Sequence, residues 1–344
     1  VAWANAPTGD RLKRPRHAVV WHYLRTTFAE MSLARSHVLF SAAALVPLLA
    51  ANTSAFAQAD GSKDRFDSVY VKDYSRILTG RVFSSTKYNK MQLGGLRSTK
   101  SLIFRPNNKI NFGVGASYRA LTLNIGVGIP VLNKDQEKLG RTRYLDAQAN
   151  IYTKRWASNL FLQSFHGYYV SSYTLPELGW HETTESPTRP DILQYNLGVS
   201  TVHIFNNDRF SYRAAFNQDA WQRRSQGTLL IGGYATYFRL QSDSSLVPER
   251  LASEFDPGLH MRRGDFWDIG PSAGYAYTFV LKEHWFLTGS VVLGGGLSIQ
   301  RAVTDEDLAE DVVKTVAGLG WHGQFRAGAG YNGAKYYVGM SFNQ

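Results

Sequence analysis

The stretch KINFGVGASYRALTLNIGVGI, residues 109–129, alternates apolar side chains with small or polar ones over two arms of similar length. In the second arm, apolar residues occupy every odd position from Leu121 to Ile129, and threonine, asparagine and glycine lie between them. Only Arg119 and Ala120 remain between the arms. A period of two around a two-residue connection predicts a tight antiparallel β-hairpin.

The length and the small inward residues of this hairpin favour a membrane-spanning strand pair. Each arm has about the 9 to 11 residues that a tilted strand needs to cross a bilayer. Glycine, asparagine and threonine would fill a soluble core poorly. We therefore expect the apolar face to meet lipid and the other face to line a wet interior.

The composition predicts one glycine-rich β-domain. The 31 glycines among 344 residues exceed the usual share of about 7%, and 19 Tyr, 19 Phe and 8 Trp accompany them. The chain has no cysteine, which excludes disulfides, thiol catalysis and cysteine-bound zinc. The net charge of +11 is scattered over loops and strand ends, so we expect no nucleic-acid partner.

The N-terminal part of the chain predicts export. Basic Arg35, the apolar run VLFSAAALVPLLA and the small residues AFAQA form a Sec signal peptide over residues 31–59. Residues 1–30 show no periodicity and are expected to be a non-native upstream extension. Residues 60–344 then form the outer-membrane β-barrel.

The rest of the chain predicts an all-β, transmembrane, antiparallel up-and-down barrel of about 12 strands, or 14. Short turns alternate with long polar loops, as in outer-membrane barrels. Aromatic residues beside the turns predict one interfacial girdle: Tyr152, Trp156, Phe205, Phe210, Phe279, Trp285, Tyr331 and Tyr336. The expected strands are 79–88, 109–118, 121–129, 143–153, 158–170, 192–205, 209–217, 228–240, 269–280, 285–299, 316–331 and 335–342.

The strand count has one inconsistency. Between the short turns at Asn207 and Lys282 an even number of strands is required, and three are expected. The sequence therefore leaves open the strand number and the side on which residues 241–268 lie. The alternative fold is a soluble β-sandwich or lipocalin-like barrel with its apolar face inward.

Three groups of residues are candidates for a site. Ser164, His166 and Asp146 contain the parts of a nucleophilic triad, but no signature sequence surrounds them, and polar rim or lumen residues are the simpler interpretation. The acidic run 305–311 has the oxygen ligands of a hard cation without the glycine spacing of a calcium loop. We therefore assign no catalytic, cofactor-binding or metal residue.

Three arginine pairs complete the candidates. They could face a lumen or meet lipopolysaccharide phosphates at a rim, although ordinary loop charges are the simpler account. The pairs are Arg141 with Arg143, Arg223 with Arg224, and Arg262 with Arg263.

Several blocks in order resemble the domain of unknown function 4421 family, predicted outer-membrane β-barrels chiefly from Bacteroidota. They are Arg105-Pro106-Asn107, the hairpin 111–123, Tyr144-Leu145-Asp146, Gly167-Tyr168-Tyr169 and residues 270–279. The resemblance spans about residues 67–342 and implies location and architecture, with no catalytic residues to transfer. Members usually continue to a last strand that ends in an aromatic residue, so a C-terminal truncation is also expected.

The sequence thus predicts a porin-like Gram-negative outer-membrane protein of unknown specific role, as a passive pore or a surface-binding barrel. The alternatives are a membrane-embedded lipid or lipopolysaccharide hydrolase and a plugged structural barrel that displays loops. Expected partners are outer-membrane lipid and lipopolysaccharide, the barrel-assembly machinery during insertion, and small solutes. No cofactor is expected.

Overall fold

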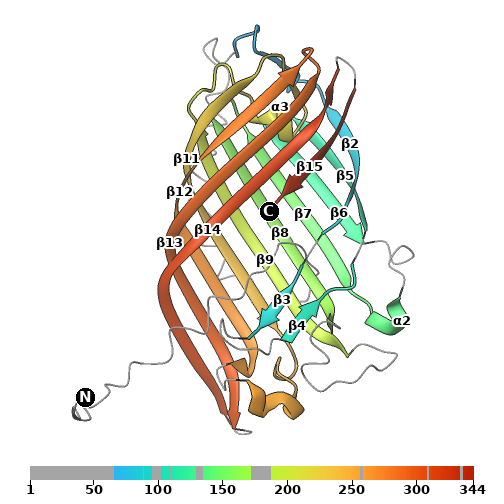
Figure 1. Ribbon diagram of the computed structural model, residues 1–344, viewed down its shortest axis with the longest axis vertical. Coiled ribbons are helices and arrows are strands. Elements are labelled where there is room, and N and C mark those ends of the chain that lie inside the picture. The colour runs from blue at the N-terminus through green and yellow to red at the C-terminus, as the bar shows by residue number, and fades with distance from the viewer. Residues whose placement is uncertain are drawn as a thin grey trace, which may run out of the picture.

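The computed structural model describes residues 66–87, 89–94, 102–108, 110–128, 135–171, 187–255, 259–307, 310–333 and 336–344. The expected extension 1–30 and signal peptide 31–59 lie outside these residues. Within them the protein is all-β with very little helix (Figure 1).

Fifteen strands are assigned in the described chain. The helical elements are α2 (Gln136–Leu139), α3 (Tyr212–Phe216) and the 3-10 helix η7 (Glu249–Glu254). The strands are β1 (Val71–Asp73), β2 (Thr79–Ser85), β3 (Met91–Leu93), β4 (Leu102–Arg105), β5 (Asn111–Tyr118), β6 (Leu121–Gly128), β7 (Arg143–Tyr152), β8 (Trp156–Val170), β9 (Thr188–Ile204), β10 (Ala220–Gln222), β11 (Gln226–Gln241), β12 (Met261–Leu281), β13 (Trp285–Asp307), β14 (Glu310–Asn332) and β15 (Tyr337–Asn343).

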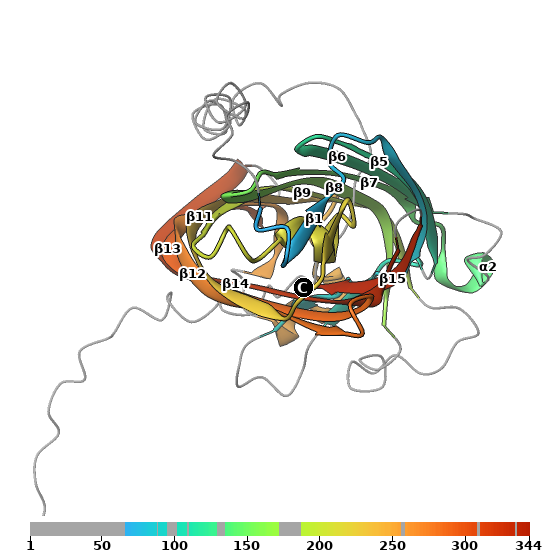
Figure 2. The same ribbon diagram turned by 90° about the horizontal axis from the view of Figure 1, so that it is seen from above.

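One antiparallel up-and-down sheet dominates the molecule. Its main path runs β15-β14-β13-β12-β11-β9-β8-β7-β6-β5-β2, so neighbours in space are almost always neighbours in sequence. The sheet curls around an interior, and β15 returns toward the side of β2 and β5 (Figure 2). In the described chain β2 and β15 are its two edges, with no ladder between them. The predicted up-and-down all-β architecture is confirmed.

The hairpin β5–β6 has the predicted register and alternation. Asn111 pairs with Gly128 and Tyr118 with Leu121. On the outer side, the side chains of Val114, Leu123 and Ile125 are at least half exposed, at 62%, 50% and 53%. Ser117 and Thr122 on the inner side are fully buried and joined by a 2.8 Å hydroxyl hydrogen bond. The lipocalin-like alternative required the opposite orientation, so it does not describe this hairpin.

The predicted strand at 209–217 is wrong. The segment turns into the interior at Phe210 and forms α3. Of the strands of the main sheet, only β11 and β12 therefore lie between the turns at Asn207 and Lys282, because β10 pairs with β1 in the separate small sheet, and the even number required of an up-and-down sheet is restored. Tyr212, Ala214 and Phe216 alternate with polar or small residues as a strand would, which explains the error.

Strands β12, β13 and β14 are longer than predicted. β12 begins at Met261, so the last part of the expected loop 241–268 is strand. β13 extends to Asp307, and β14 already begins at Glu310. The connections β5–β6, β7–β8, β12–β13 and β14–β15 lie at one end of the sheet, called here the turn end, together with the segment between β9 and β11 that contains α3 (Figure 1). The opposite end, called the loop end, has the connections β6–β7, β8–β9, β11–β12 and β13–β14. None of the helices in the described residues is long and apolar enough to cross a membrane.

Candidate functional site: the two faces and the filled interior

The outer face of β11–β14 is apolar over most of its length. On β12 every second residue from Trp267 to Phe279 points outward, and the register places apolar or glycine positions of β11, β13 and β14 beside them. Leu293, Leu319 and Trp321 are 65%, 85% and 87% exposed. Among these described outward positions there is no Asp, Glu, Lys or Arg.

The inner face is polar and buried, which reverses the arrangement of a soluble protein. Hydroxyl, amide and carboxylate side chains line it, and bulky apolar ones are concentrated at its two ends. The buried polar residues of the wall include Asn111, Asp146, Asn150, Gln163, Gln194, Asn196, Ser272, Thr288, Ser290 and Ser298.

Helix α3 fills the interior at the turn end. Ser211 caps it by accepting a 3.3 Å hydrogen bond from the backbone N–H of Ala214, which satisfies one of the free donors of the first turn. All five residues of α3 are buried. Tyr212 and Phe216 pack on a wall of apolar side chains that includes Leu230 and Phe286. Beside α3, strands β1 and β10 form a small sheet, and β1 lies within the ring of strands in Figure 2.

A buried ion pair holds the segment that contains α3. Arg213 donates hydrogen bonds to both carboxylate oxygens of Asp219, at 3.1 Å and 2.7 Å. The two residues are only 5% and 2% exposed. The same guanidinium donates to the backbone carbonyl oxygens of Tyr152, at 3.1 Å, and of Arg119. Arg213 thus connects the interior segment that contains α3, called here the plug, to the ends of β5 and β7.

A second buried arginine reaches the plug from the wall. Arg326 on β14 donates from Nη1 to the hydroxyl of Tyr152 at 2.5 Å and to Oδ1 of Asn159 at 2.9 Å. Its guanidinium carbon lies 4.2 Å from the ring centre of Phe216. A cation this close to an aromatic face in a dry environment is attracted to it, so Arg326 joins β14, β7, β8 and α3.

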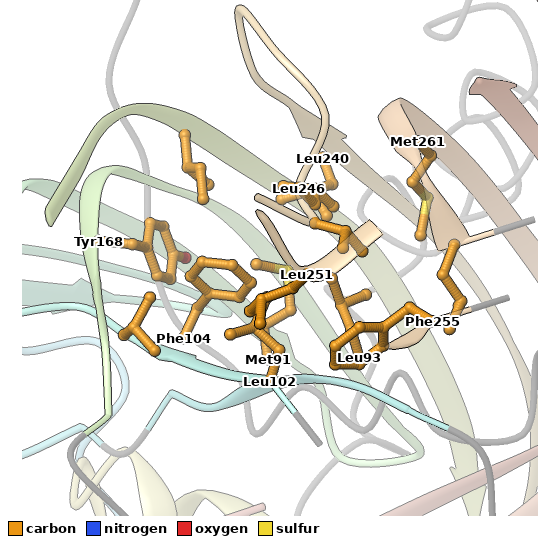
Figure 3. Packing of buried hydrophobic residues seen from close by; sticks show 14 of the residues in the cluster. Met91, Leu93, Leu102, Phe104, Tyr168, Leu240, Leu246, Leu251, Phe255 and Met261 are labelled. Atoms are coloured by element: carbon orange, nitrogen blue, oxygen red, sulfur yellow. The ribbon is translucent and has the colours of Figure 1, made fainter. Parts of the chain in front are cut away.

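At the loop end the interior is filled by apolar side chains. The β3–β4 pair adds to β8 through Phe104 opposite Val170. Its buried residues meet others from η7, β11 and β12 (Figure 3). Figure 3 draws Met91, Leu93, Leu102, Phe104, Tyr168, Leu240, Leu246, Leu251, Phe255 and Met261 in this cluster.

The strand register separates the three residues of the candidate triad, Ser164, His166 and Asp146. Asp146 pairs with Gln163, and Leu145 pairs with Ser164. Directly opposite residues share a face of a sheet and successive residues alternate, so Asp146 points inward while Ser164 and His166 point outward. Asp146 instead binds Lys87 at 3.0 Å and Gln148 at 2.7 Å. The three residues do not assemble into a triad.

The acidic run lies on the β13–β14 hairpin, where Asp305 pairs with Asp311 and Asp307 with Glu310. The side chains of residues 305–312 lie outside the described part of the chain. Among the described residues no cluster of three or more histidine, aspartate or glutamate side chains is suited to a metal.

The arginine pairs have separate surroundings. Arg223 lies at the turn end, where it binds Glu283 at 2.9 Å and holds the pKa of that carboxyl below its ordinary value. Arg263 lies on the outer face at the loop end and binds Asp265 at 2.9 Å. Arg141 and Arg143 are exposed at the start of β7.

Five of the aromatic residues expected beside the turns are exposed at the turn end. Phe205, Phe279, Trp285 and Tyr336 are 53–69% exposed and Trp156 is 38% exposed. Two of the expected members are wrong, because Tyr152 and Phe210 are fully buried against α3. A second aromatic group, which the sequence interpretation missed, lies on the outer face at the loop end, where Tyr237 stacks on Trp267 with ring centres 5.4 Å apart.

The fold and interior define an all-β protein built on one long, curled antiparallel sheet with buried segments inside it. The chain belongs to the family described as Domain of unknown function (DUF4421), whose model matches residues 65–344. This finding confirms the resemblance seen in the sequence. No curated protein and no solved structure matches the chain.

Proposed function

We propose that this protein is a transmembrane β-barrel of the outer membrane with an occluded lumen, exported by the signal peptide at residues 31–59. The observation that carries the proposal is the reversal of the two faces: apolar side chains outside, without charge at the described positions from the level of Trp267 to that of Phe279, and buried polar ones inside. An apolar outer surface of this extent favours contact with lipid.

The height of the apolar face is consistent with a bilayer. From Trp267 to Phe279 there are twelve residue steps on β12, or about 40 Å at about 3.3 Å per residue. A strand tilt of about 45° reduces this to about 28 Å, close to the ~25 Å apolar band of outer-membrane barrels. Aromatic groups lie at both margins of the band, as interfacial girdles do.

The filled ends favour a plugged barrel over a passive pore. Helix α3 at the turn end and the β3–β4 cluster at the loop end occupy the space through which solute would pass. The polar wall between them remains a surface for binding, and the long loops remain a surface for display. The hydrolase alternative loses its support with the separation of Asp146 from Ser164 and His166.

Single-channel recording of the full chain, refolded from detergent into planar bilayers, tests both parts of the proposal. We expect folded protein whose electrophoretic mobility changes on boiling, and no stable conductance steps. Salt-dependent steps of constant size would overturn the occluded lumen but keep the barrel. Failure to insert into any bilayer would overturn the membrane assignment.

A further inference from the structure

We infer that a row of arginines on the outer face at the loop end is a binding site for the phosphate groups of a glycolipid of the lipid A type. The inference rests on the proposed membrane location and adds a ligand to it. The site consists of Arg239 on β11, Arg263 on β12 and Arg301 on β13, around Asp265.

Along the outer face, successive rows of side chains become more polar toward the loop end. Ala235, Ile269 and Leu297 form one apolar row across β11–β13. The next row toward the loop end contains Tyr237, Trp267 and Ile299, and the following row Arg239, Asp265 and Arg301. Apolar, aromatic and cationic rows in this order match the hydrocarbon, interface and head-group layers of a membrane.

Asp265 positions two of the guanidinium groups. Its carboxylate, 1% exposed, accepts from Nε of Arg239 at 2.6 Å, from Nε of Arg263 at 2.9 Å and from the hydroxyl of Tyr237 at 2.7 Å. Each arginine uses its single Nε–H for this bond. The terminal NH2 groups of both arginines are not needed for these two bonds to Asp265.

The charge and geometry of the cluster suit a phosphate group. Three arginines around one carboxylate leave two net positive charges at the margin of the apolar face. Guanidinium groups held in place bind phosphate oxygens through paired N–H donors more specifically than a lysine point charge does. Because the acyl chains of the same lipid would lie on the adjoining apolar rows, a lipid phosphate fits this site better than a free anion.

The test is binding of lipid A to the folded full chain in nanodiscs, compared with lipid A from which the phosphates have been removed. We expect Arg239→Gln/Arg301→Gln to weaken binding about 25-fold, from about fivefold for each arginine near a charged lipid surface, and to leave binding of the dephosphorylated lipid unchanged. The matched control is Arg155→Gln, an exposed arginine at the turn end, which should retain the affinity of the unmodified chain.

Asp265→Asn distinguishes a site in which Asp265 holds the guanidinium groups in place from simple attraction between the phosphate and the net positive charge. Without the carboxylate the net charge rises, so attraction alone predicts tighter binding, whereas loss of the positioned guanidinium groups predicts weaker binding. Weaker binding supports the inference and tighter binding overturns it. Equal affinity for the two lipid forms, or equal losses in the double variant and the control, also overturns it.

Insertion is scored separately by the mobility shift on boiling, so failure of the membrane proposal is distinguishable from failure of the lipid site. Should the double variant fail to fold, the exposed Arg301→Gln alone is expected to lose about fivefold. An unchanged affinity in that variant would overturn the inference.

Discussion

Charged side chains occur in the interior of the sheet but are absent from most described positions on the outer face of β11–β14. Arg213, Asp219 and Arg326 are buried inside, where each has hydrogen-bond partners. On the outer face of β11–β14, the described positions between the arginine row and the turn end have no charge at all. The difference teaches that the interior supplies specific partners to polar groups, whereas the exterior supplies none and is suited to lipid.

The largest effect is expected from breaking the inner ion pair. Arg213→Met leaves the carboxylate of Asp219 buried without its partner, which costs about 3–5 kcal/mol. Urea unfolding of the protein in lipid vesicles measures the loss. The matched variant Arg213→Met/Asp219→Leu removes both charges and should recover more than half of it. Equal losses in the single and double variants would mean that the ion pair is not what holds α3.

A charge introduced on the outer face should lower the free energy of unfolding slightly less than this, by an amount that depends on its depth in the membrane. Leu293→Arg puts a guanidinium in the middle of the apolar face, and about 2–4 kcal/mol of unfolding free energy should be lost in vesicles. Val303→Arg lies ten residues along the same face of β13, beside Arg263, and should cost about 0–1 kcal/mol. Similar losses at both positions would contradict a membrane around this face.

An inner glycine under an aromatic ring is the next test. A Cβ at Gly198 would lie 2.2 Å from Cζ of Phe161 on the neighbouring strand, so Gly198→Ala should overpack the wall at a cost of about 1–3 kcal/mol. Gly80 has no atom within 4 Å of such a Cβ, and Gly80→Ala serves as the control in the same unfolding assay. Adding Phe161→Leu should reduce the loss at Gly198 if the ring causes it.

The smallest effect is expected at the turn end, where ions meet water. Lys154 binds Asp208 at 2.6 Å and lowers the pKa of that carboxyl below its ordinary value. A depressed pKa contributes stability above the unfolded pKa, near 4, and this contribution disappears as the pH falls through the folded value. Because Asp208 is largely exposed, the contribution is a few tenths of a kcal/mol, at about the level of a surface pair.

Asp208→Asn should therefore lower stability slightly at pH 7 and leave it unchanged at pH 3. Unfolding free energies of both proteins at the two pH values check this sign. A loss that persists at pH 3 would show that the side chain acts through packing and not through its charge.

Local pattern was enough to predict most strands and the side of the sheet to which their residues point. The hairpin β5–β6 has the predicted turn, pairing and alternation, because a period of two is a property of neighbouring residues. The same reasoning failed at 209–217, where α3 mimics that period over five residues. Its aromatic residues are buried by a wall made of distant strands.

The sites depended on register more than on composition. Ser164, His166 and Asp146 have the residue types of a triad, but Asp146 lies on the opposite face of the sheet from the other two. The pairing of Asp146 with Gln163, and not with Ser164, decides this. Of the three arginines of the proposed lipid site, the sequence alone indicated only Arg263. Its other members, Arg239 and Arg301, are brought beside Asp265 by two separate strand pairings.

By itself the sequence determined an all-β chain, the antiparallel hairpin at its centre, the alternation of short turns with long loops, and membership of its family. The strand pattern and the turns follow from spacing between near neighbours, and family membership follows from similarity of several sequence blocks. The tertiary structure alone decided that α3 fills the interior, that Tyr152 points inward and that Arg326 reaches it from 174 residues away. Such contacts are selected by the curl and register of the whole sheet, which no single stretch of residues encodes.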